Sequence, residues 1–211
     1  MGTEHDWRSA IWGCVVLAAL LGAPRAAAQE LVANGGFDTD VASWIDSFPG
    51  TDMSFSWSAV DADGAFGSGS MQIDTSITNG TASGPRQCVP TIPGLHHASA
   101  RVLIPEQVNP PVPWLALRFF SLEGCGGTQL ASGSGFPGTA PNAWLDAAID
   151  LAAPAGTQSA QLWLLSGNTT DPAIAIAHFD QVSLVPEAGH AAGLVAAAAA
   201  LLGLRAGRRR H

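Results

Sequence analysis

Short apolar runs separated by clusters of Gly, Pro, Asn, Asp and Ser occupy the chain from Leu31 to Leu184. No long helical period of apolar residues is visible in this region. Many short strands with turn residues between them are typical of an all-β sandwich or barrel. The strands that we predict are Met53–Val60, Ser70–Thr75, Arg86–Thr91, His97–Ile104, Trp114–Leu122, Trp144–Leu151, Ser159–Ser166 and Ala173–Leu184.

Turn-forming residues fill the gaps between these runs. Gly, Pro and Asp cluster at Asp61–Gly64, Pro93–Gly94, Gly124–Gly127 and Pro154–Gly156. These residue types favour turns because Gly accepts positive φ angles, Pro fixes φ, and the Asp carboxylate accepts a hydrogen bond from a backbone N–H two residues further on. The run Ser132-Gly133-Ser134-Gly135 precedes no helical pattern, so we predict a flexible loop there.

The first 28 residues have the pattern of a secretory signal peptide. Arg8 precedes the apolar run Ile11–Ala23, and Ala26–Ala28 provides the small residues that a signal peptidase requires. A lipid-attachment cysteine is the alternative for Cys14, but such a cysteine follows the hydrophobic region and Cys14 lies inside it. Cleavage after Ala28 would leave a central domain, residues 29–186.

The C-terminal segment, residues 187–211, combines a short motif, an apolar stretch and arginines. Pro186-Glu187-Ala188 precedes the stretch Ala191–Leu204, which Arg205 and Arg208–Arg210 follow. Arginines after an apolar helix are typical of a stop-transfer segment. The 14 residues of this stretch would rise about 21 Å as a helix, which is short for a hydrocarbon core of about 30 Å.

This tail resembles the PEP-CTERM sorting signal of Gram-negative bacteria, in a variant that has Ala188 where a second proline is most frequent. The resemblance implies a transmembrane sorting helix, transient anchoring in the inner membrane and processing by an exosortase-type enzyme. An ordinary C-terminal membrane anchor is the alternative. Either interpretation predicts export of the central domain to the cell surface, outer envelope or extracellular matrix.

Carboxylates dominate the charge of the central region. Between Glu30 and Glu187 there are fifteen Asp or Glu residues and three Arg, a formal balance of −12. Nucleic-acid binding requires a basic surface that neutralises phosphates, so we expect no nucleic-acid partner.

Two end-pieces carry a second resemblance. Leu31–Asp38, followed by Trp44, and His178–Leu184 resemble the opening and closing strands of jelly-roll carbohydrate-binding modules and the wider galactose-binding-like family. The resemblance extends from Glu30 to Val185 and implies an all-β, jelly-roll β-sandwich. It does not specify the ligand, because this scaffold carries many binding roles.

The same resemblance implies a structural calcium ion. The family often holds calcium between its first and last strands, which makes Asp38 and Asp180 the candidate ligands. Two adjacent carboxylates repel each other unless a cation lies between them. Ordinary turn and loop-edge roles are the alternative for both residues.

Two cysteines remain once the signal peptide is removed. An even pair in an oxidising compartment predicts a Cys88–Cys125 disulfide. A catalytic thiol paired with His96, His97 or His178 is the alternative, although no neighbouring residue marks an activated thiol.

Strand alternation indicates a candidate ligand surface. Sugars stack their C–H faces on aromatic rings while polar side chains bind the hydroxyls. In Trp114–Phe120, alternation places Leu115, Leu117 and Phe119 on the core side. If this strand shares a sheet with the strands at His97 and Ser159, one concave face carries Arg101, Trp114, Arg118, Gln161 and Trp163.

The chain contains no Gly-x-Ser-x-Gly elbow, His-Glu-x-x-His zinc motif or phosphate-binding glycine loop. We therefore predict a non-catalytic protein that binds polysaccharide, either the cell's own exopolysaccharide or an environmental glycan. A structural or adhesive matrix protein with no small-molecule site is the alternative. A minimal hydrolase is the third hypothesis.

Overall fold

A computed structural model describes residues 29–46, 53–76, 82–108, 110–167 and 174–187, and within them extended strands account for almost all regular structure. Eleven strands and one short 3-10 turn are present in this part of the chain. Their bounds are β1 (Ile45–Asp46), β2 (Met53–Ser58), β3 (Ser70–Thr75), β4 (Ala82–Ser83), β5 (Pro85–Pro90), β6 (Gly94–Leu103), β7 (Val112–Leu122), η1 (Glu123–Cys125), β8 (Gly126–Gly135), β9 (Trp144–Ala153), β10 (Ser159–Gly167) and β11 (Ala175–Pro186).

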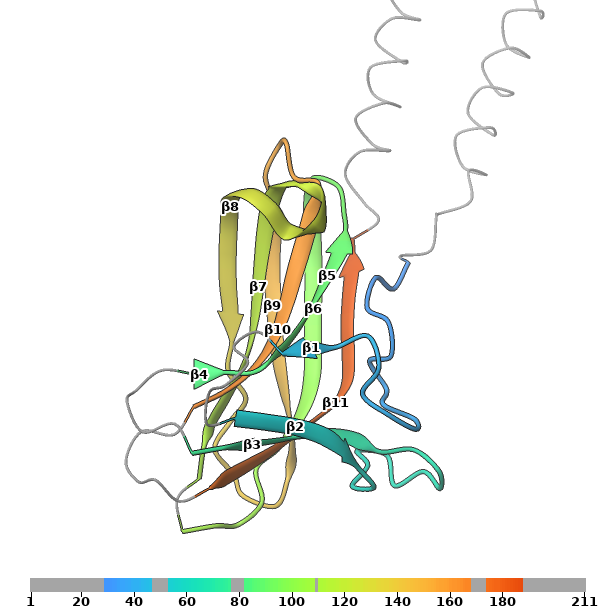
Figure 1. Cartoon of the computed structure of the whole chain (residues 1–211), viewed down its shortest axis with the longest axis vertical. Helices are drawn as coiled ribbons and strands as arrows, with labels where there is room; N and C mark the ends of the chain where they lie inside the picture. The colour runs from blue at the N-terminus through green and yellow to red at the C-terminus, as the bar shows by residue number, and fades with distance from the viewer. Residues whose placement is uncertain (1–28, 47–52, 77–81, 109, 168–173, 188–211) are drawn as a thin grey trace, which may run out of the picture. The chain divides into compact units, whose positions relative to one another are not determined.

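These strands form two antiparallel sheets (Figure 1). The first sheet has the order β1-β5-β10-β7-β8, with β4 paired to β10, and the second sheet has the order β2-β3-β11-β6-β9. The predicted all-β fold is therefore confirmed. Consecutive strands often lie in different sheets, as β6 and β7 do, which determines where the candidate site residues end up.

The hydrophobic core lies between the inner faces of the two sheets. The inward side of β7 contributes Leu115, Leu117 and Phe119, all fully buried, as alternation predicts. Phe179 from β11 and Phe37 from the segment before β1 are also fully buried in this cluster. Each such side chain contributes about 1.5–3 kcal/mol by leaving water.

The loop predicted at Ser132-Gly133-Ser134-Gly135 is wrong, because these residues form the end of β8 and pair with β7. The glycines are needed where β8 packs against β9. A Cβ atom on Gly135 would lie 2.3 Å from the carbonyl oxygen of Ala148. Glycine therefore lets the edge strands of the two sheets approach closely, while the alternating serines are exposed.

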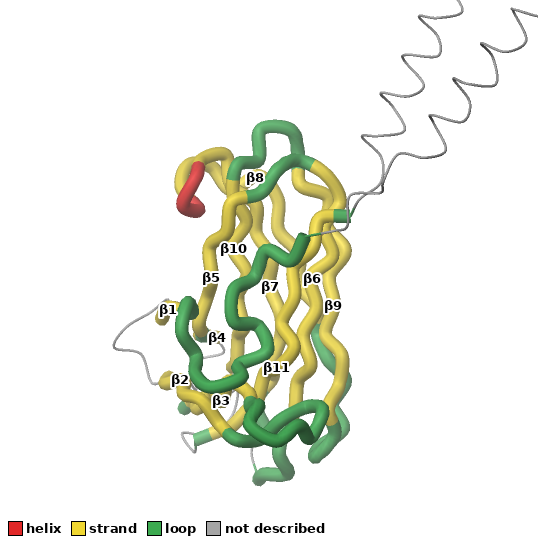
Figure 2. Tube along the Cα trace, turned by 90° about the vertical axis from the view of Figure 1, so that its right-hand side faces the viewer, coloured by secondary structure: helices red, strands yellow, loops and turns green. Residues whose placement is uncertain are grey.

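The two end-pieces of the domain lie side by side, as the family resemblance implies (Figure 2). The Leu31 amide donates to the Leu184 carbonyl oxygen at 3.0 Å, and the Val182 amide donates to the Gly35 carbonyl oxygen at 2.9 Å. The strand β11 pairs with β3 up to Phe179, and the N-terminal segment bonds to β11 beyond that point. The first segment of the chain thus extends the second sheet along β11.

Cys88 and Cys125 form a disulfide, which confirms the predicted pairing. The bond ties β5 to η1, the turn between β7 and β8. Because both sulfurs are bonded to each other, neither residue is a free thiol for the alternative Cys–His pair.

The predicted signal peptide, residues 1–28, and the predicted helix and arginine cluster after Glu187 lie outside the described residues. Within the residues that the structure describes, no helix is long and apolar enough to cross a membrane.

Two buried histidines make stability depend on pH. His96 is fully buried; its Nδ1 donates to the Gly94 carbonyl oxygen at 3.0 Å in the neutral tautomer, and its Nε2 then accepts from the Thr91 hydroxyl at 2.6 Å. Burial lowers the pKa of His96, and burial also lowers the pKa of His178. Below the ordinary value of 6.5, the unfolded chain therefore binds more protons than the folded chain.

We expect the free energy of unfolding to fall as the pH drops below the ordinary histidine value of about 6.5, and this slope to be smaller in His96→Gln. Urea unfolding midpoints measured across this range check the prediction. Identical slopes in the original and substituted chains would contradict it.

Candidate functional site

The outer face of the first sheet brings together most of the predicted ligand residues. Strands β7 and β10 are neighbours, with Arg118 opposite Gln161 and Ala116 opposite Trp163. Because directly opposite residues share a face, Trp114, Arg118, Gln161 and Trp163 all lie on the same side of this sheet. The structure thus unites four of the five residues in the predicted ligand set.

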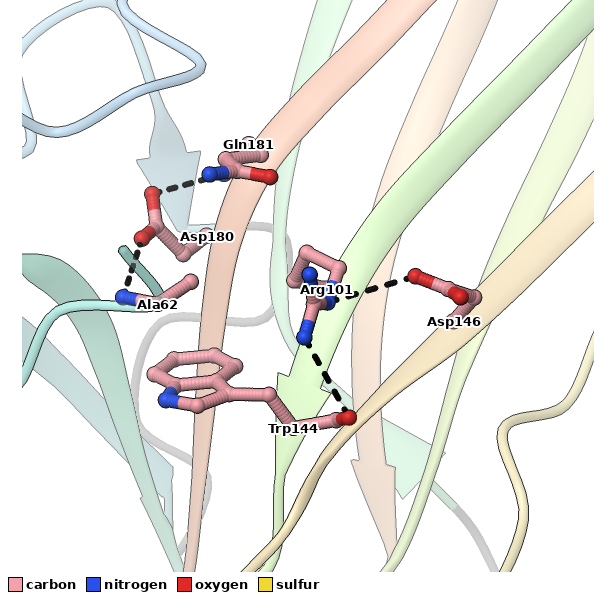
Figure 3. A network of polar contacts seen from close by, with 6 residues as sticks. All are labelled: Ala62, Arg101, Trp144, Asp146, Asp180 and Gln181. Atoms are coloured by element: carbon pink, nitrogen blue, oxygen red, sulfur yellow. Dashed lines mark hydrogen bonds and ion pairs between the residues drawn. The ribbon is translucent and has the colours of Figure 1, made fainter. Parts of the chain in front are cut away.

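Arg101 is the exception, and the expectation that all three strands share one sheet is wrong. Arg101 lies on β6 in the second sheet, opposite Asp180 of β11 and Asp146 of β9. Its Nε is 3.2 Å from Asp146 Oδ1, and its Nη2 donates to the Trp144 carbonyl oxygen at 3.4 Å (Figure 3). Alternation within β6 predicts its outward orientation correctly but carries no information on which sheet the strand joins.

Trp163 is the floor of the face and not an exposed sugar platform. It is only 4% exposed and clusters with Ala116 and Leu165. The guanidinium carbons of Arg86 and Arg118 lie 5.3 and 4.9 Å from its ring centroid. Its Nε1 donates to Gln161 Oε1 at 2.6 Å, so Gln161, itself buried, orients the indole.

A groove of about 260 Å³ opens above this floor. We call it the outer groove. Its walls come from β4, β7, β8 and β10. In this sheet β10 pairs with β4 and β7, and β7 pairs with β8. The lining residues are Ala82, Trp114, Ala116, Arg118, Ser132, Gly133, Ser134, Trp163 and Leu165.

The exposed aromatic surface of the outer groove is Trp114. Its side chain is half-buried, and its ring centroid lies 5.7 Å from that of Phe136, which is 61% exposed. Aromatic rings at this spacing pack favourably and present a broad apolar face. The hydroxyls of Ser132 and Ser134 are exposed along the β8 wall. An aromatic pair beside hydroxyls and a guanidinium can bind a sugar through stacking and hydrogen bonds.

Our prediction from sequence missed Phe136, Ser132, Ser134 and Arg86. The serines alternate with glycines, and this period of two is itself the signal of a strand with one polar, exposed face. Arg86 is directly opposite Trp163 in the β5–β10 pairing, which only the sheet order reveals.

The environment of Asp180 bears on the predicted calcium site. Asp180 is 2% exposed, and its carboxylate accepts N–H bonds from Ala62 at 2.9 Å and from Gln181 at 2.6 Å (Figure 3). Burial raises the pKa of Asp180, and the charges of Asp61 and Asp63 raise that pKa further.

The two predicted calcium ligands differ in their surroundings. Asp38 is exposed, and no described contact joins it to Asp180. Both Asp180 oxygens already accept backbone N–H groups. Within the described ranges, no group of three or more His, Cys, Asp or Glu side chains is arranged to hold a metal ion. Calcium binding by this chain stays a prediction.

Comparison with known proteins identifies the fold. No protein-family model matches the chain, and no curated protein matches it in sequence. Solved structures do match. The enzymatically active domain of tailspike protein 4 from bacteriophage CBA120 is 16% identical with a TM-score of 0.58, over 75% of this chain and 21% of that chain.

Two further similar structures contain carbohydrate-binding modules. The CBM22-1–CBM22-2 tandem domain of Paenibacillus barcinonensis Xyn10C is 15% identical with a TM-score of 0.53, over 80% of this chain and 52% of that chain. The CBM22-1–GH10 modules of Clostridium thermocellum endo-1,4-β-D-xylanase 10B, complexed with xylohexaose, are 13% identical with a TM-score of 0.52. The match covers 75% of this chain and 29% of that chain. This chain thus spans about half or less of each of these proteins. At such identities the similarity shows the fold alone, and that fold is the antiparallel β-sandwich of jelly-roll carbohydrate-binding modules.

Proposed function

We propose that this chain is an exported, non-catalytic protein that binds polysaccharide in the outer groove. The observation that carries the proposal is the Trp114–Phe136 aromatic pair at a groove of about 260 Å³ that is also lined by serine hydroxyls and Arg118. Small-molecule sites combine apolar lining with a few polar groups in this way. A second hollow, of about 220 Å³ on the second sheet, has no aromatic or basic side chain in its lining and is the weaker candidate.

The composition of the groove walls supports binding without catalysis. Glycoside hydrolysis generally requires two carboxyl groups on either side of the scissile bond. Strands β4, β5, β7, β8 and β10 contain no Asp or Glu. A glycan seated over these strands would therefore meet aromatic, hydroxyl and guanidinium groups.

We expect Trp114→Ala to weaken polysaccharide binding about tenfold, because truncation of an aromatic anchor typically removes about 1–2 kcal/mol and each 1.4 kcal/mol is a factor of about ten. Affinity electrophoresis against xylan, galactan, polygalacturonate and dextran sulfate measures the effect. Trp57→Ala is the matched control, since Trp57 is 39% exposed on β2 of the second sheet. Equal losses in the two variants would argue against the outer groove.

The alternative function is a structural or adhesive matrix protein with no glycan site. Correct folding together with no retention by any polysaccharide in the panel would favour that alternative. Release of reducing sugar from a panel member would instead revive the hydrolase hypothesis.

We also propose that the ends of the chain direct its export and sorting. The support is the sequence pattern of residues 1–28 and 187–211, which implies signal-peptide cleavage, transient membrane anchoring and exosortase-type processing. Mass spectrometry of the cell-surface form should show a chain that begins at Gln29 and lacks the terminal arginines. An intact chain in the cytosol would contradict this proposal.

A further inference from the structure

We infer that the outer groove selects anionic polysaccharides, whose sugar rings carry carboxylate or sulfate groups. This inference rests on the proposed function and names the ligand class of that site. Three observations carry it: the segregation of charge between the sheets, two arginines that form no ion pair with a described residue, and their convergence on one indole ring.

Charge is strongly segregated in this acidic chain. Five strands of the first sheet, β4, β5, β7, β8 and β10, contain two arginines and no carboxylate. Carboxylates are concentrated in the second sheet, where β3, β9 and β11 carry Asp74, Asp146, Asp150 and Asp180. The outer face of these five strands is therefore cationic in a region whose formal balance is −12, and the edge strand β1 adds Asp46 to the same sheet.

The arginines of the two sheets differ in their partners. Arg101 in the second sheet is paired with the Asp146 carboxylate at 3.2 Å. Arg86 and Arg118 have no ion pair with any residue that the structure describes, and both guanidinium groups lie over the Trp163 ring. The region has many carboxylates, yet none of those described neutralises these two guanidinium groups.

Arg86 and Arg118 approach Trp163 from opposite neighbouring strands, β5 and β7. Both guanidinium carbons lie within 5.3 Å of one ring centroid, so two like charges converge on a nearly buried indole. An anion bound beside either guanidinium would be attracted by its positive charge. A guanidinium stacked on an aromatic ring keeps its N–H donors in its own plane, and these match carboxylate and sulfate oxygens.

Arg118 is placed to use this chemistry on a sugar. It lines the groove directly, on the strand that carries Trp114, and it is opposite the exposed Ser132 on β8. Trp114 and Arg118 are four residues apart on β7, about 13 Å along the strand. A polysaccharide stacked on Trp114 and running along the groove would therefore bring the acidic substituent of a neighbouring sugar unit to Arg118. Neutral sugars would gain the stacking contact but not the charge-assisted hydrogen bonds.

The test compares polymers that differ only in charge. Isothermal titration calorimetry of the full chain measures its affinity for both members of two pairs. The first pair is polygalacturonate and its methyl-esterified form, and the second is dextran sulfate and dextran. We expect at least about tenfold tighter binding to the anionic member of a pair and an affinity that falls with added salt, because ionic contacts are screened. A preference in the first pair identifies carboxylate as the anion, and a preference in the second identifies sulfate.

Three variants locate the effect. Arg118→Gln should reduce anionic binding about tenfold or more, whereas Arg101→Gln removes the same charge from the second sheet and should not. Ser132→Asp places a carboxylate opposite Arg118 at an exposed position that tolerates substitution, and it should also weaken anionic binding. Unchanged melting temperatures show that each variant is folded.

Each outcome separates this inference from the proposed function. Equal binding of charged and neutral members, or losses in Arg101→Gln that match those in Arg118→Gln, would overturn the anionic assignment and leave polysaccharide binding intact. Binding to none of the four polymers, nor to xylan or galactan, would overturn both.

Discussion

Replacement of Cys88 and Cys125 together by Ala should lower the free energy of unfolding by about 4 kcal/mol. The disulfide closes a loop with a sequence separation of 37 residues. In the chain-entropy account, a cross-link of that span removes about 4 kcal/mol of conformational freedom from the unfolded chain. The bond fixes η1 and the start of β8 against β5, at the far end of the first sheet from the Trp114 side chain.

Urea unfolding of the oxidised chain, the reduced chain and the double variant measures this effect. The reduced chain and the double variant should have similar midpoints, both well below that of the oxidised chain. Added reductant should leave the double variant unchanged. A difference below about 1 kcal/mol between oxidised and double-variant chains would contradict the assigned role of the bond.

Gly35→Ala should destabilise the domain by about 3 kcal/mol, at the upper end of typical overpacking effects. A Cβ atom at this position would lie 1.9 Å from the Val182 carbonyl oxygen. That oxygen belongs to the backbone of β11, so relief requires the N-terminal segment to move away. Such movement would stretch the Val182–Gly35 hydrogen bond that joins the two ends of the domain.

The neighbouring glycine provides a matched control. A Cβ atom on Gly36 would have one contact, at 3.7 Å from Asp38 Oδ1, which is ordinary van der Waals distance. Gly36→Ala should therefore leave the melting temperature nearly unchanged. Similar melting temperatures for the Gly35→Ala and Gly36→Ala chains would show that the two end-pieces are not packed as closely as described.

Strand alternation predicted the orientation of side chains well. The inward set on β7, Leu115, Leu117 and Phe119, is fully buried, and Trp114 and Arg118 lie on the outer face. Local alternation succeeds because successive side chains in any strand point to opposite faces. The eight predicted strands were all found, with ends displaced by a few residues.

Sequence could not predict which strands share a sheet. Arg101 and Arg118 both point outward, but β6 and β7 lie in different sheets, so the two residues are on different faces. The partition depends on long-range pairing, which the residues of one strand do not encode. The same limit explains Trp163, which is buried among residues of other strands, including Arg86 and Arg118 on its two neighbours.

The loop prediction for the end of β8 was wrong for a different physical reason. Ser-Gly repeats are usual in flexible segments, and Gly weakens an isolated strand. In this fold the glycines are required by the close approach of β9, where Gly135 lies against the Ala148 backbone. The repeat therefore supplies both the packing side of the strand and the hydroxyl wall of the outer groove.

The most direct test of the central claim is to map bound ligand on the isotope-labelled chain by NMR. The titrant is an oligosaccharide prepared from a panel polysaccharide that the chain retains. Binding in the outer groove should shift the Trp114 indole N–H and the Arg118 and Ser132 amides and leave the Arg101 and Trp144 amides of the second sheet unmoved. Shifts confined to the second sheet would contradict ligand binding in the outer groove.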